Sequence, residues 1–295
     1  MTDRAPIHPD TALGPVTLAV ADRERALAFY RDFLGLRVLT DDGRAVTLGV
    51  DAAPLFVLLP QPGLRPAPRR ATGLYHAAVL LPERVHLAHV LRRLIESGYR
   101  FGASDHLVSE ALYLDDPDGN GLEIYRDRPR TEWPRRGAQI AMATLALDAE
   151  GILGTLRDGA PPWRGMPPGT RIGHVHLKVG DVAAAERFYH EVLGFDVMAY
   201  YPGAVFLSAG GYHHHIGANA WESAGAPPAP PETAGLRSFV IYQPDAAAVA
   251  WVRARLAAAG VATRDDGGGL AFEDPWRNPI VITTAPRPAP PEVSR

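Results

Sequence analysis

The feature that most constrains this chain is an internal repeat. Residues 20–38, VADRERALAFYRDFLGLRV, align without a gap on residues 179–197, VGDVAAAERFYHEVLGFDV. In both segments an aspartate, Asp22 or Asp181, stands where a helix N-cap belongs, apolar residues follow at helical spacing, and a Leu-Gly pair ends the run. Both segments are therefore predicted to form the same helix, and the fold is predicted to contain this helix twice.

A second pair of segments agrees more loosely. Gly73-Leu74 matches Gly235-Leu236, and DPDGN at residues 116–120 matches DPWRN at residues 274–278. The two repeats together predict four units of about 50 residues, each reading strand, helix and three short strands. The predicted fold class is therefore α+β, built from four βαβββ units.

The predicted boundaries follow from these units and from Pro-rich stretches between them. The end of the chain, APRPAPPEVSR, is expected to be disordered. The boundaries are residues 10–62 for unit one, 72–128 for unit two, 129–170 for a connector with a possible helix in its apolar segment 140–156, 171–221 for unit three, 222–234 for an extended Pro-rich linker, 235–285 for unit four and 286–295 for a tail.

Composition narrows the class of partner. The formal net charge is −3, and the sequence has no Lys/Arg stripe of the kind that binds nucleic acid or an anionic membrane. The segment MTDRAPIHPD lacks the apolar stretch of a signal peptide, and no run approaches the ~18 apolar residues of a membrane span. We therefore expect a cytoplasmic protein whose partner is a small molecule, with a homo-oligomer left open.

Three residues could together hold a metal ion. His76 and His174 each begin a predicted strand, in GLYHAAVLLP and IGHVHLKV, and Glu123 lies in DPDGNGLEIY. The chain has no cysteine, so any metal must be held by His, Asp or Glu. Two histidines and one carboxylate form the face that binds non-haem Fe(II) and leaves positions open. Each residue alone is more often structural, so the prediction depends on the three occurring together.

The four βαβββ units, the FYxxxLG helix and the DPDGNGLEIY strand resemble the vicinal oxygen chelate superfamily. This superfamily includes glyoxalases, bleomycin-resistance proteins and type I extradiol dioxygenases. The resemblance implies that two units pair in each of two lobes, with curved mixed sheets around a metal cavity. The fold alone does not choose the reaction.

The resemblance also implies which units bind metal, since ligands in the superfamily come from the first and last strands of paired units. The positions that match the three candidate ligands in units one and four are Pro15, Ser238 and Val281, and these units look metal-free. Only units two and three retain candidate ligands, with His76 and Glu123 in unit two and His174 in unit three. We therefore expect units two and three to form the metal-bearing lobe and units one and four to form the other.

A run of histidines follows in FLSAGGYHHHIG, residues 206–217. We expect it on the last strand of unit three, where neighbouring residues alternate faces. In isolation the run could also bind a further metal or be an exposed polar strand. Extradiol dioxygenases carry Phe-Leu, a short loop and His-His here, and the second histidine is the acid/base. The resemblance places these residues at Phe206, Leu207, His213 and His214, while His215 departs from the pattern and leaves open which of the three histidines faces the metal.

Further residues carry over from the same resemblance. Tyr113 stands ten residues before Glu123, as does the tyrosine of extradiol enzymes that hydrogen-bonds a substrate oxygen, although a packed strand aromatic is the alternative. The pair Asp105-His106 matches an Asp-His pair of the family at a spacing two residues longer. We expect substrate contacts from His213, His176, Phe206, Asp105 and His106.

These features predict a non-haem Fe(II) extradiol dioxygenase, similar to catechol 2,3-dioxygenase, that cleaves a small aromatic diol with O₂. Mn(II) is an alternative metal. A glyoxalase-like isomerase or lyase is the chief alternative function, although such enzymes usually take a fourth carboxylate ligand from the last strand of the second paired unit. A metal-free protein of the same fold that binds or sequesters a small molecule is the other alternative. The ring substituents of the substrate and its pathway are not readable from the sequence.

Overall fold

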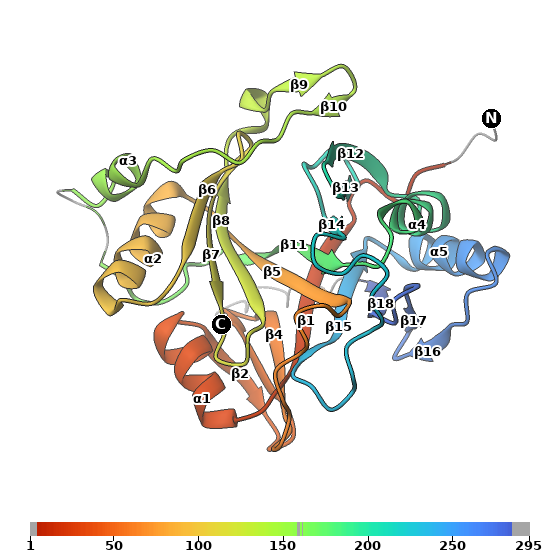
Figure 1. The fold of residues 1–295 in the computed structure, drawn as a ribbon, viewed down its shortest axis with the longest axis horizontal. Coiled ribbons are helices and arrows are strands. Elements are labelled where there is room, and N and C mark those ends of the chain that lie inside the picture. Colours follow the sequence, from red (N-terminus) through yellow and green to blue (C-terminus); the bar gives the residue numbers. More distant parts are fainter. Residues whose placement is uncertain (1–4, 158–159, 161, 285–295) are drawn as a thin grey trace, which may run out of the picture.

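The computed structural model describes residues 5–157, 160 and 162–284. Within them each of the four units reads βαβββ, as the repeats predict (Figure 1). The elements of units one and two are β1 (Ala12–Val20), α1 (Arg23–Leu27), β2 (Arg37–Asp41), β3 (Val46–Val50), β4 (Ala53–Pro60), β5 (Gly73–Leu81), α2 (Arg84–Ser97), β6 (Gly102–Asp105), β7 (Ser109–Asp115) and β8 (Gly121–Asp127). Those of units three and four are β11 (Arg171–Lys178), α4 (Val182–Glu186), β12 (Asp196–Tyr201), β13 (Ala204–Ser208), β14 (Ile216–Asn219), β15 (Gly235–Gln243), α5 (Ala246–Ala258), β16 (Arg264–Asp266), β17 (Gly269–Glu273) and β18 (Pro279–Thr284).

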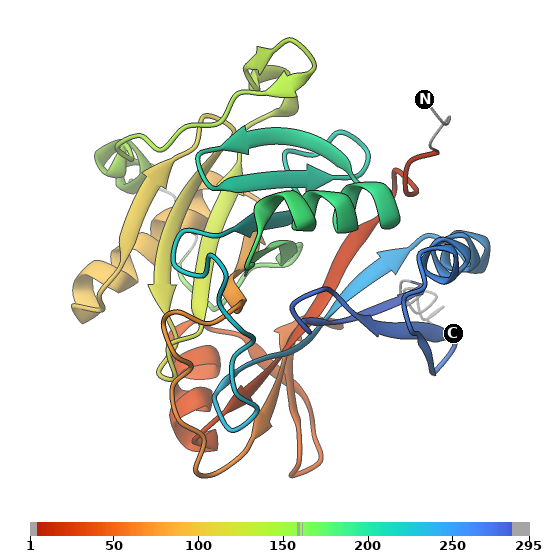
Figure 2. The same cartoon turned by 45° about the vertical axis from the view of Figure 1, so that its right-hand side comes forward.

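The units pair two with three and one with four, in two eight-stranded mixed sheets. The strand orders are β12-β13-β14-β11-β5-β8-β7-β6 and β16-β17-β18-β15-β1-β4-β3-β2. In each sheet the first strands of the two units meet antiparallel at the centre, and each first strand runs parallel to the last strand of its own unit. Figure 2 shows the two sheets as the upper and lower parts of the molecule. The expected fold class and pairing are confirmed.

The repeated FY helices begin and end as their sequences predict. The side chains of Asp22 and Asp181 each accept a hydrogen bond at 2.9 Å from a backbone N–H of the first turn, as N-caps do. Both helices then continue as a π-helical turn, Ala28–Phe33 or Arg187–Val192, which the sequence pattern did not predict. The Leu-Gly pair follows each turn, and its glycine takes a left-handed conformation.

One core holds the two lobes together. A single cluster of buried apolar side chains includes Leu18 of β1, Phe239 of β15, Ala77 of β5 and Val175 of β11. Burial of apolar surface stabilises by roughly 25 cal/mol per Å². The central strands of both sheets are therefore fixed by one hydrophobic core, and these include β5 and β11, which carry two of the predicted ligands.

The connector 129–170 is mostly irregular. It contains β9 (Arg135–Arg136), β10 (Gln139–Ile140) and α3 (Ala149–Gly154), so a helix forms over only part of segment 140–156. Trp133 and Ile140 of the connector pack against Tyr212 and Met198 of unit three. The connector therefore covers one end of the lobe formed by units two and three.

The linker 222–234, described throughout, forms turns and isolated bridges and no helix or strand. Residues 158, 159 and 161 of the connector, residue 285 and the tail 286–295 lie outside the described residues. Among the described residues, no helix is long and apolar enough to cross a membrane.

Candidate metal centre

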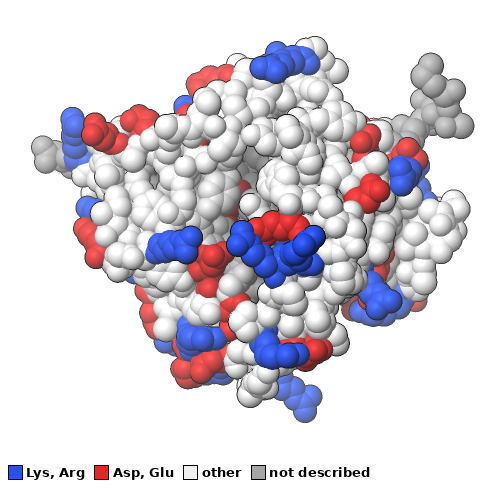
Figure 3. Space-filling view, in the orientation of Figure 1, with Lys and Arg blue, Asp and Glu red and all other residues white. Residues whose placement is uncertain are grey.

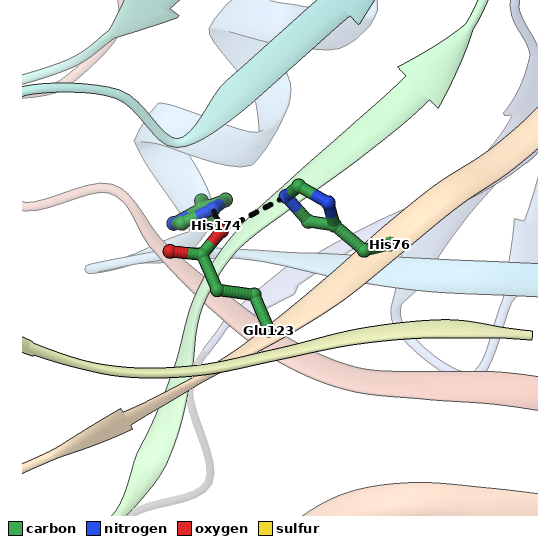
Figure 4. A group of neighbouring side chains, drawn as sticks. All are labelled: His76, Glu123 and His174. Carbon is green, nitrogen blue, oxygen red and sulfur yellow. Dashed lines mark hydrogen bonds and ion pairs between the residues drawn. The ribbon is translucent and has the colours of Figure 1, made fainter. Parts of the chain in front are cut away.

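His76, Glu123 and His174 point toward one another from β5, β8 and β11 (Figure 4). His174 Nε2 lies 2.9 Å from Glu123 Oε2, and His76 Nε2 lies 3.0 Å from the same oxygen. All three side chains are buried, and one possible ligand atom from each lies within 4.8 Å of the other two. The structure therefore brings the predicted triad together.

Strand register explains this convergence. Ala78 of β5 pairs with His174 of β11 on one side and with Glu123 of β8 on the other. Directly paired residues lie on the same face of a sheet, and so does His76, two residues before Ala78. The small side chain of Ala78 therefore lies between the two paired side chains and leaves space above it for the three polar groups to meet.

Burial and mutual contact set the charges in the cluster. Burial alone would raise the pKa of Glu123, but the neighbouring His174 and His76 outweigh this effect and hold that pKa well below its usual range. Burial lowers the pKa of His174 to about 4. At neutral pH, Glu123 is therefore a carboxylate and His174 a neutral imidazole, which are the protonation states that metal binding requires.

The residues fit a divalent metal ion. Two buried nitrogens of the cluster, His76 Nε2 and His174 Nδ1, have no hydrogen-bond partner among the described residues, although the first lies close to Glu123. A buried polar atom without a partner costs about 1–3 kcal/mol. A cation between the three side chains would give His76 Nε2 a partner. The donor set of two imidazoles and one carboxylate is the one that non-haem Fe(II) sites use.

The other sheet lacks this cluster. In the sheet of units one and four, Val240 pairs with Val281, just as Ala78 pairs with Glu123 in the other sheet. Val281 therefore occupies the position that corresponds to the glutamate. Ser238 lies two residues before Val240 and takes the place of a histidine. Within the described part of the chain, His76, Glu123 and His174 are the one group found with metal-ligand geometry.

A cavity of about 1180 Å³ opens on the triad. Figure 3 shows a hollow near the centre of the face that it draws, with charged groups of both signs scattered around it. His174 is not among the residues that line the cavity and lies beneath them. Of the predicted site residues, the lining includes His76, Glu123, His106, Tyr113, His176, Phe206 and His214.

Tyr113 and His106 are joined in the cavity wall. His106 Nε2 lies 2.6 Å from Tyr113 Oη, and His106 Nδ1 lies 2.6 Å from the carbonyl oxygen of Ala143 in the connector. A carbonyl only accepts, so Nδ1 carries the hydrogen and Nε2 of a neutral ring accepts from the Tyr113 hydroxyl. Burial raises the pKa of Tyr113 well above its usual value. Tyr113 is therefore a neutral phenol at the cavity.

Asp105, one of the predicted substrate contacts, is not among the residues that line the cavity. Its carboxylate binds Arg128 at 2.5 Å and accepts from the backbone N–H of Leu107 at 2.8 Å, beside the cavity wall. The ion pair with Arg128 compensates the partial burial of this carboxylate. The structure therefore separates Asp105 from its sequence neighbour His106, which does face the cavity.

The expectation that the histidine run lies on a strand is wrong. The three histidines, His213, His214 and His215, lie in the loop between β13 and β14. Strand β14 begins only at Ile216. Two consecutive left-handed residues, Gly210 and Gly211, turn the chain after β13 and shift the run out of the strand. Its three side chains still point in different directions, but loop geometry and not strand alternation separates them.

Only the middle histidine of the run faces the cavity. The ring of His214 lies 4.0 Å from that of His174 and 4.9 Å from that of Phe206, between ring centroids. Burial lowers the pKa of His214 well below its usual value, so the ring is neutral. His213 lies behind it and binds Asp127 at 2.9 Å. His215 Nδ1 accepts from the backbone N–H of Ala209 at 3.2 Å.

Sequence comparison assigns the family. A family model described as the glyoxalase/bleomycin resistance protein/dioxygenase superfamily matches residues 12–124 and 171–282. The first stretch covers most of units one and two, and the second covers most of units three and four. The chain belongs to this superfamily.

Relatives within the superfamily indicate the kind of reaction. The chain is 43% identical over 281 residues to catechol-2,3-dioxygenase of Bacillus subtilis (strain 168), and the match covers 91% of this chain and 95% of that protein. This match confirms the expectation of an enzyme of the dioxygenase type.

Solved structures of superfamily members share the fold. A crystal structure described as a candidate dioxygenase from Bacillus subtilis has a TM-score of 0.66 at 16% identity, covering 96% of this chain and 87% of that one. Glyoxalase I from Zea mays has a TM-score of 0.57 at 14% identity, covering 93% of this chain and 92% of that one. At these identities the likeness concerns the fold alone.

In this chain, a glycine occupies the position at which glyoxalase-like enzymes usually carry a fourth metal ligand. His176 pairs with Gly217 of β14 as Ala78 pairs with Glu123 of β8, so Gly217 is the counterpart of the glutamate in unit three. A Cβ atom at Gly217 would lie 2.8 Å from Cγ of the His176 ring. Any side chain there would displace that ring, so β14 supplies no fourth protein ligand.

Sequence reasoning missed several residues around the candidate metal centre. The rings of Tyr75 and Trp221 lie 5.1 and 5.6 Å from the ring of His176 and extend the aromatic wall of the cavity. Asp127, the partner of His213, was also missed. Its signal was available, since Asp127 lies four residues after Glu123 on β8 and alternate strand residues share a face.

Proposed function

We propose that this protein is a non-haem Fe(II) extradiol dioxygenase that cleaves the ring of a catechol-type substrate with O₂. The observation that carries the proposal is the three-residue ligand set with an open side, facing a cavity that also holds a neutral histidine and a phenol. The 43% identity to a catechol-2,3-dioxygenase supports it. A cytoplasmic location and a role in aromatic degradation belong to the same proposal.

His76, His174 and Glu123 would hold the metal. When bound, Fe(II) supplies Lewis acidity toward the diol oxygens and redox chemistry toward O₂. Mn(II) has similar preferences and suits the same donor set. Because three protein ligands leave adjacent positions open, a substrate with two neighbouring hydroxyls and O₂ can reach the same centre.

The remaining residues bind, orient and move protons. His214, neutral and facing the cavity, is suited to accept a proton from a diol hydroxyl at its free ring nitrogen and to return it later in the reaction. Tyr113 lines the cavity and would hold a substrate oxygen by a hydrogen bond once its hydroxyl hydrogen turns from His106 to the substrate. The rings of His176 and Phe206, 5.6 Å apart, form a wall against which an aromatic ring can pack.

The glyoxalase-like alternative has weaker support. Such an isomerase would usually need a carboxylate at the position of Gly217, where a side chain meets the ring of His176. The metal-free alternative leaves unexplained why two histidines and a glutamate are buried together with an unpartnered nitrogen at His76. The dioxygenase proposal accounts for both observations.

The proposal can be tested with protein purified without air and loaded with Fe(II). Mixing with catechol or 4-substituted catechols in air should consume one O₂ per substrate and give a yellow ring-fission product. The Glu123→Ala protein should do neither. Fully iron-loaded protein that consumes no O₂ with any of these diols would refute the proposal, as would equal activity of the Glu123→Ala protein.

A further inference from the structure

A chain of polar groups lies behind His214, on the side away from the cavity. His214 Nδ1 lies 2.8 Å from His213 Nδ1, and His213 Nε2 lies 2.9 Å from Asp127 Oδ1. The chain links the cavity wall to the end of β8, the strand that also carries Glu123. The proposed reaction gives no role to His213 or Asp127.

With both rings neutral, donor and acceptor chemistry gives the positions of the hydrogens. A carboxylate only accepts, so His213 Nε2 must carry a hydrogen and donate it to Asp127. A neutral imidazole has one hydrogen, which leaves His213 Nδ1 as an acceptor. The short contact between the two rings then requires His214 Nδ1 to donate. His214 Nε2, on the opposite edge of the ring, keeps a free lone pair.

The surroundings hold this arrangement in place. The ring of His213 is 1% exposed and packs against Tyr212, at 4.1 Å, and Trp133 of the connector, at 5.3 Å between ring centroids. The ring of His214 is packed against those of His174 and Phe206. A flip of either ring would replace a nitrogen of the chain by a carbon and break a buried hydrogen bond. The packing therefore holds the orientation in which His214 Nδ1 faces His213 Nδ1 and His213 Nε2 faces Asp127.

We propose that Asp127 and His213 are positioning residues that hold His214 in the tautomer whose free Nε2 faces the cavity. A base at this place needs that lone pair, because a ring with hydrogen on Nε2 could not accept a proton from the substrate. A carboxylate that orients a catalytic histidine through its other nitrogen plays the same part in Ser-His-Asp sites. Here a second histidine lies between the two. The effect on turnover rests on the proposed dioxygenase function, whereas the tautomers do not.

The tautomers can be measured directly. Protein labelled with ¹⁵N-histidine and loaded with Zn(II), which is diamagnetic, should show hydrogen on Nε2 of His213 and on Nδ1 of His214 in long-range ¹H–¹⁵N spectra. Asp127→Ala should remove this order at both rings, and Asp127→Glu should restore it in part. Hydrogen on His214 Nε2 in the unaltered protein would overturn the proposal, and so would spectra that Asp127→Ala leaves unchanged.

Kinetics test the consequence for catalysis. Asp127→Ala should keep the metal and change KM little, while kcat falls by about 10–100-fold, as is typical when a residue that orients a catalytic group is removed. Asp196→Ala, which removes an exposed carboxylate from β12 of the same lobe, is the matched control and should leave kcat unchanged.

A double-mutant cycle separates positioning from a merely structural role. In the His214→Ala protein, Asp127→Ala should cause no further loss of kcat, because the residue it positions is gone. An equal loss in both backgrounds would show that Asp127 acts otherwise and would overturn the proposal. If the unaltered protein cleaves no diol, the proposed function fails, and the ¹⁵N spectra still decide the tautomers.

Discussion

The hydroxyl of Tyr30 donates a 2.9 Å hydrogen bond to Asp116, 86 residues further along the chain. Tyr189 and Asp274 repeat this contact at 2.8 Å. Each bond joins the tyrosine of an FY helix to the DPxxN turn of the following unit, and all four side chains are buried. The two repeated motifs, the FY helix and the DPxxN turn, are therefore the two partners of this contact in each half of the chain. At Asp116 the contact anchors the turn from which β8 carries Glu123 toward His76 and His174.

Removing this contact should destabilise the protein. Asp116 also accepts from the side chain of Asn120, so Tyr30→Phe leaves a buried carboxylate with one partner fewer. We expect the free energy of unfolding to fall by about 1–3 kcal/mol, as for a buried hydrogen bond to a charged group. Urea denaturation measures this change. Tyr200→Phe, which removes an exposed hydroxyl bonded to Glu186, should cost little, and equal costs for the two variants would contradict the prediction.

Metal content should depend on Glu123. The Glu123→Ala protein loses the carboxylate that His76 and His174 both approach, so we expect it to retain less than a tenth of the metal of the unaltered protein, on the order of the loss expected for a ligand. Elemental analysis after dialysis against Fe(II) or Mn(II) gives the number. Glu96→Ala on the exposed side of α2 is the control. Full metal content in the Glu123→Ala protein would mean that the three side chains are a structural cluster.

Tyr113→Phe should bind metal normally and turn over slowly. The substitution removes the hydroxyl that bonds His106 and faces the cavity, while the ring keeps its packing. Loss of one such hydrogen bond to a reacting oxygen costs up to about 10²–10³-fold in kcat. Steady-state oxygen uptake together with metal analysis tests this expectation. Unchanged kcat at full metal content would place Tyr113 among the packed strand aromatics.

Stability should fall as the pH is lowered, in part because of His215. Burial lowers the pKa of this ring to about 3, against ~6.5 in an unfolded chain. Below pH ~6.5 the unfolded state therefore binds a proton that the folded state does not, and stability falls by up to about 1.4 kcal/mol per pH unit. His215 is partly exposed, so this slope is an upper limit.

Urea midpoints between pH 7.5 and 5 measure the slope. Burial also lowers the pKa values of His174, His176 and His214, which therefore contribute in the same direction. The comparison of interest is with His215→Asn, whose side-chain oxygen can still accept from the backbone N–H of Ala209. The variant should show a shallower slope. Parallel curves for the two proteins would show that His215 is not the group responsible.

The fold was predictable because its signals are local. Asp22 and Asp181 cap their helices through hydrogen bonds within one turn, and the DPxxN turns close through contacts within four residues. The pairing of units was predictable because Pro15 and Val281 fall where the other sheet has candidate ligands. The π-helical turns were not predicted by the sequence pattern.

The site was predictable only where strands define it. His76, Glu123 and His174 lie on one face of adjacent strands, so their period and register bring them together. The prediction that the histidine run lies on a strand was wrong because Gly210 and Gly211 turn the chain before β14 begins. The contact of His213 with Asp127 was missed although Asp127 shares a strand face with Glu123, because the loop that carries His213 has no strand period from which the direction of its side chains could be predicted.

His214→Ala should separate proton transfer from metal binding. The ring lies beside His174, but the triad is complete without it, so we expect the variant to keep its metal and to bind catechol. Removing a general acid/base typically lowers the rate by about 10²–10⁴-fold. Anaerobic catechol binding, metal content and kcat should therefore respond differently, with only kcat falling. Loss of metal would make His214 a ligand, and undiminished ring cleavage would move the proton-transfer role to another group at the cavity, with His106 as the next candidate because its ring also lines the wall.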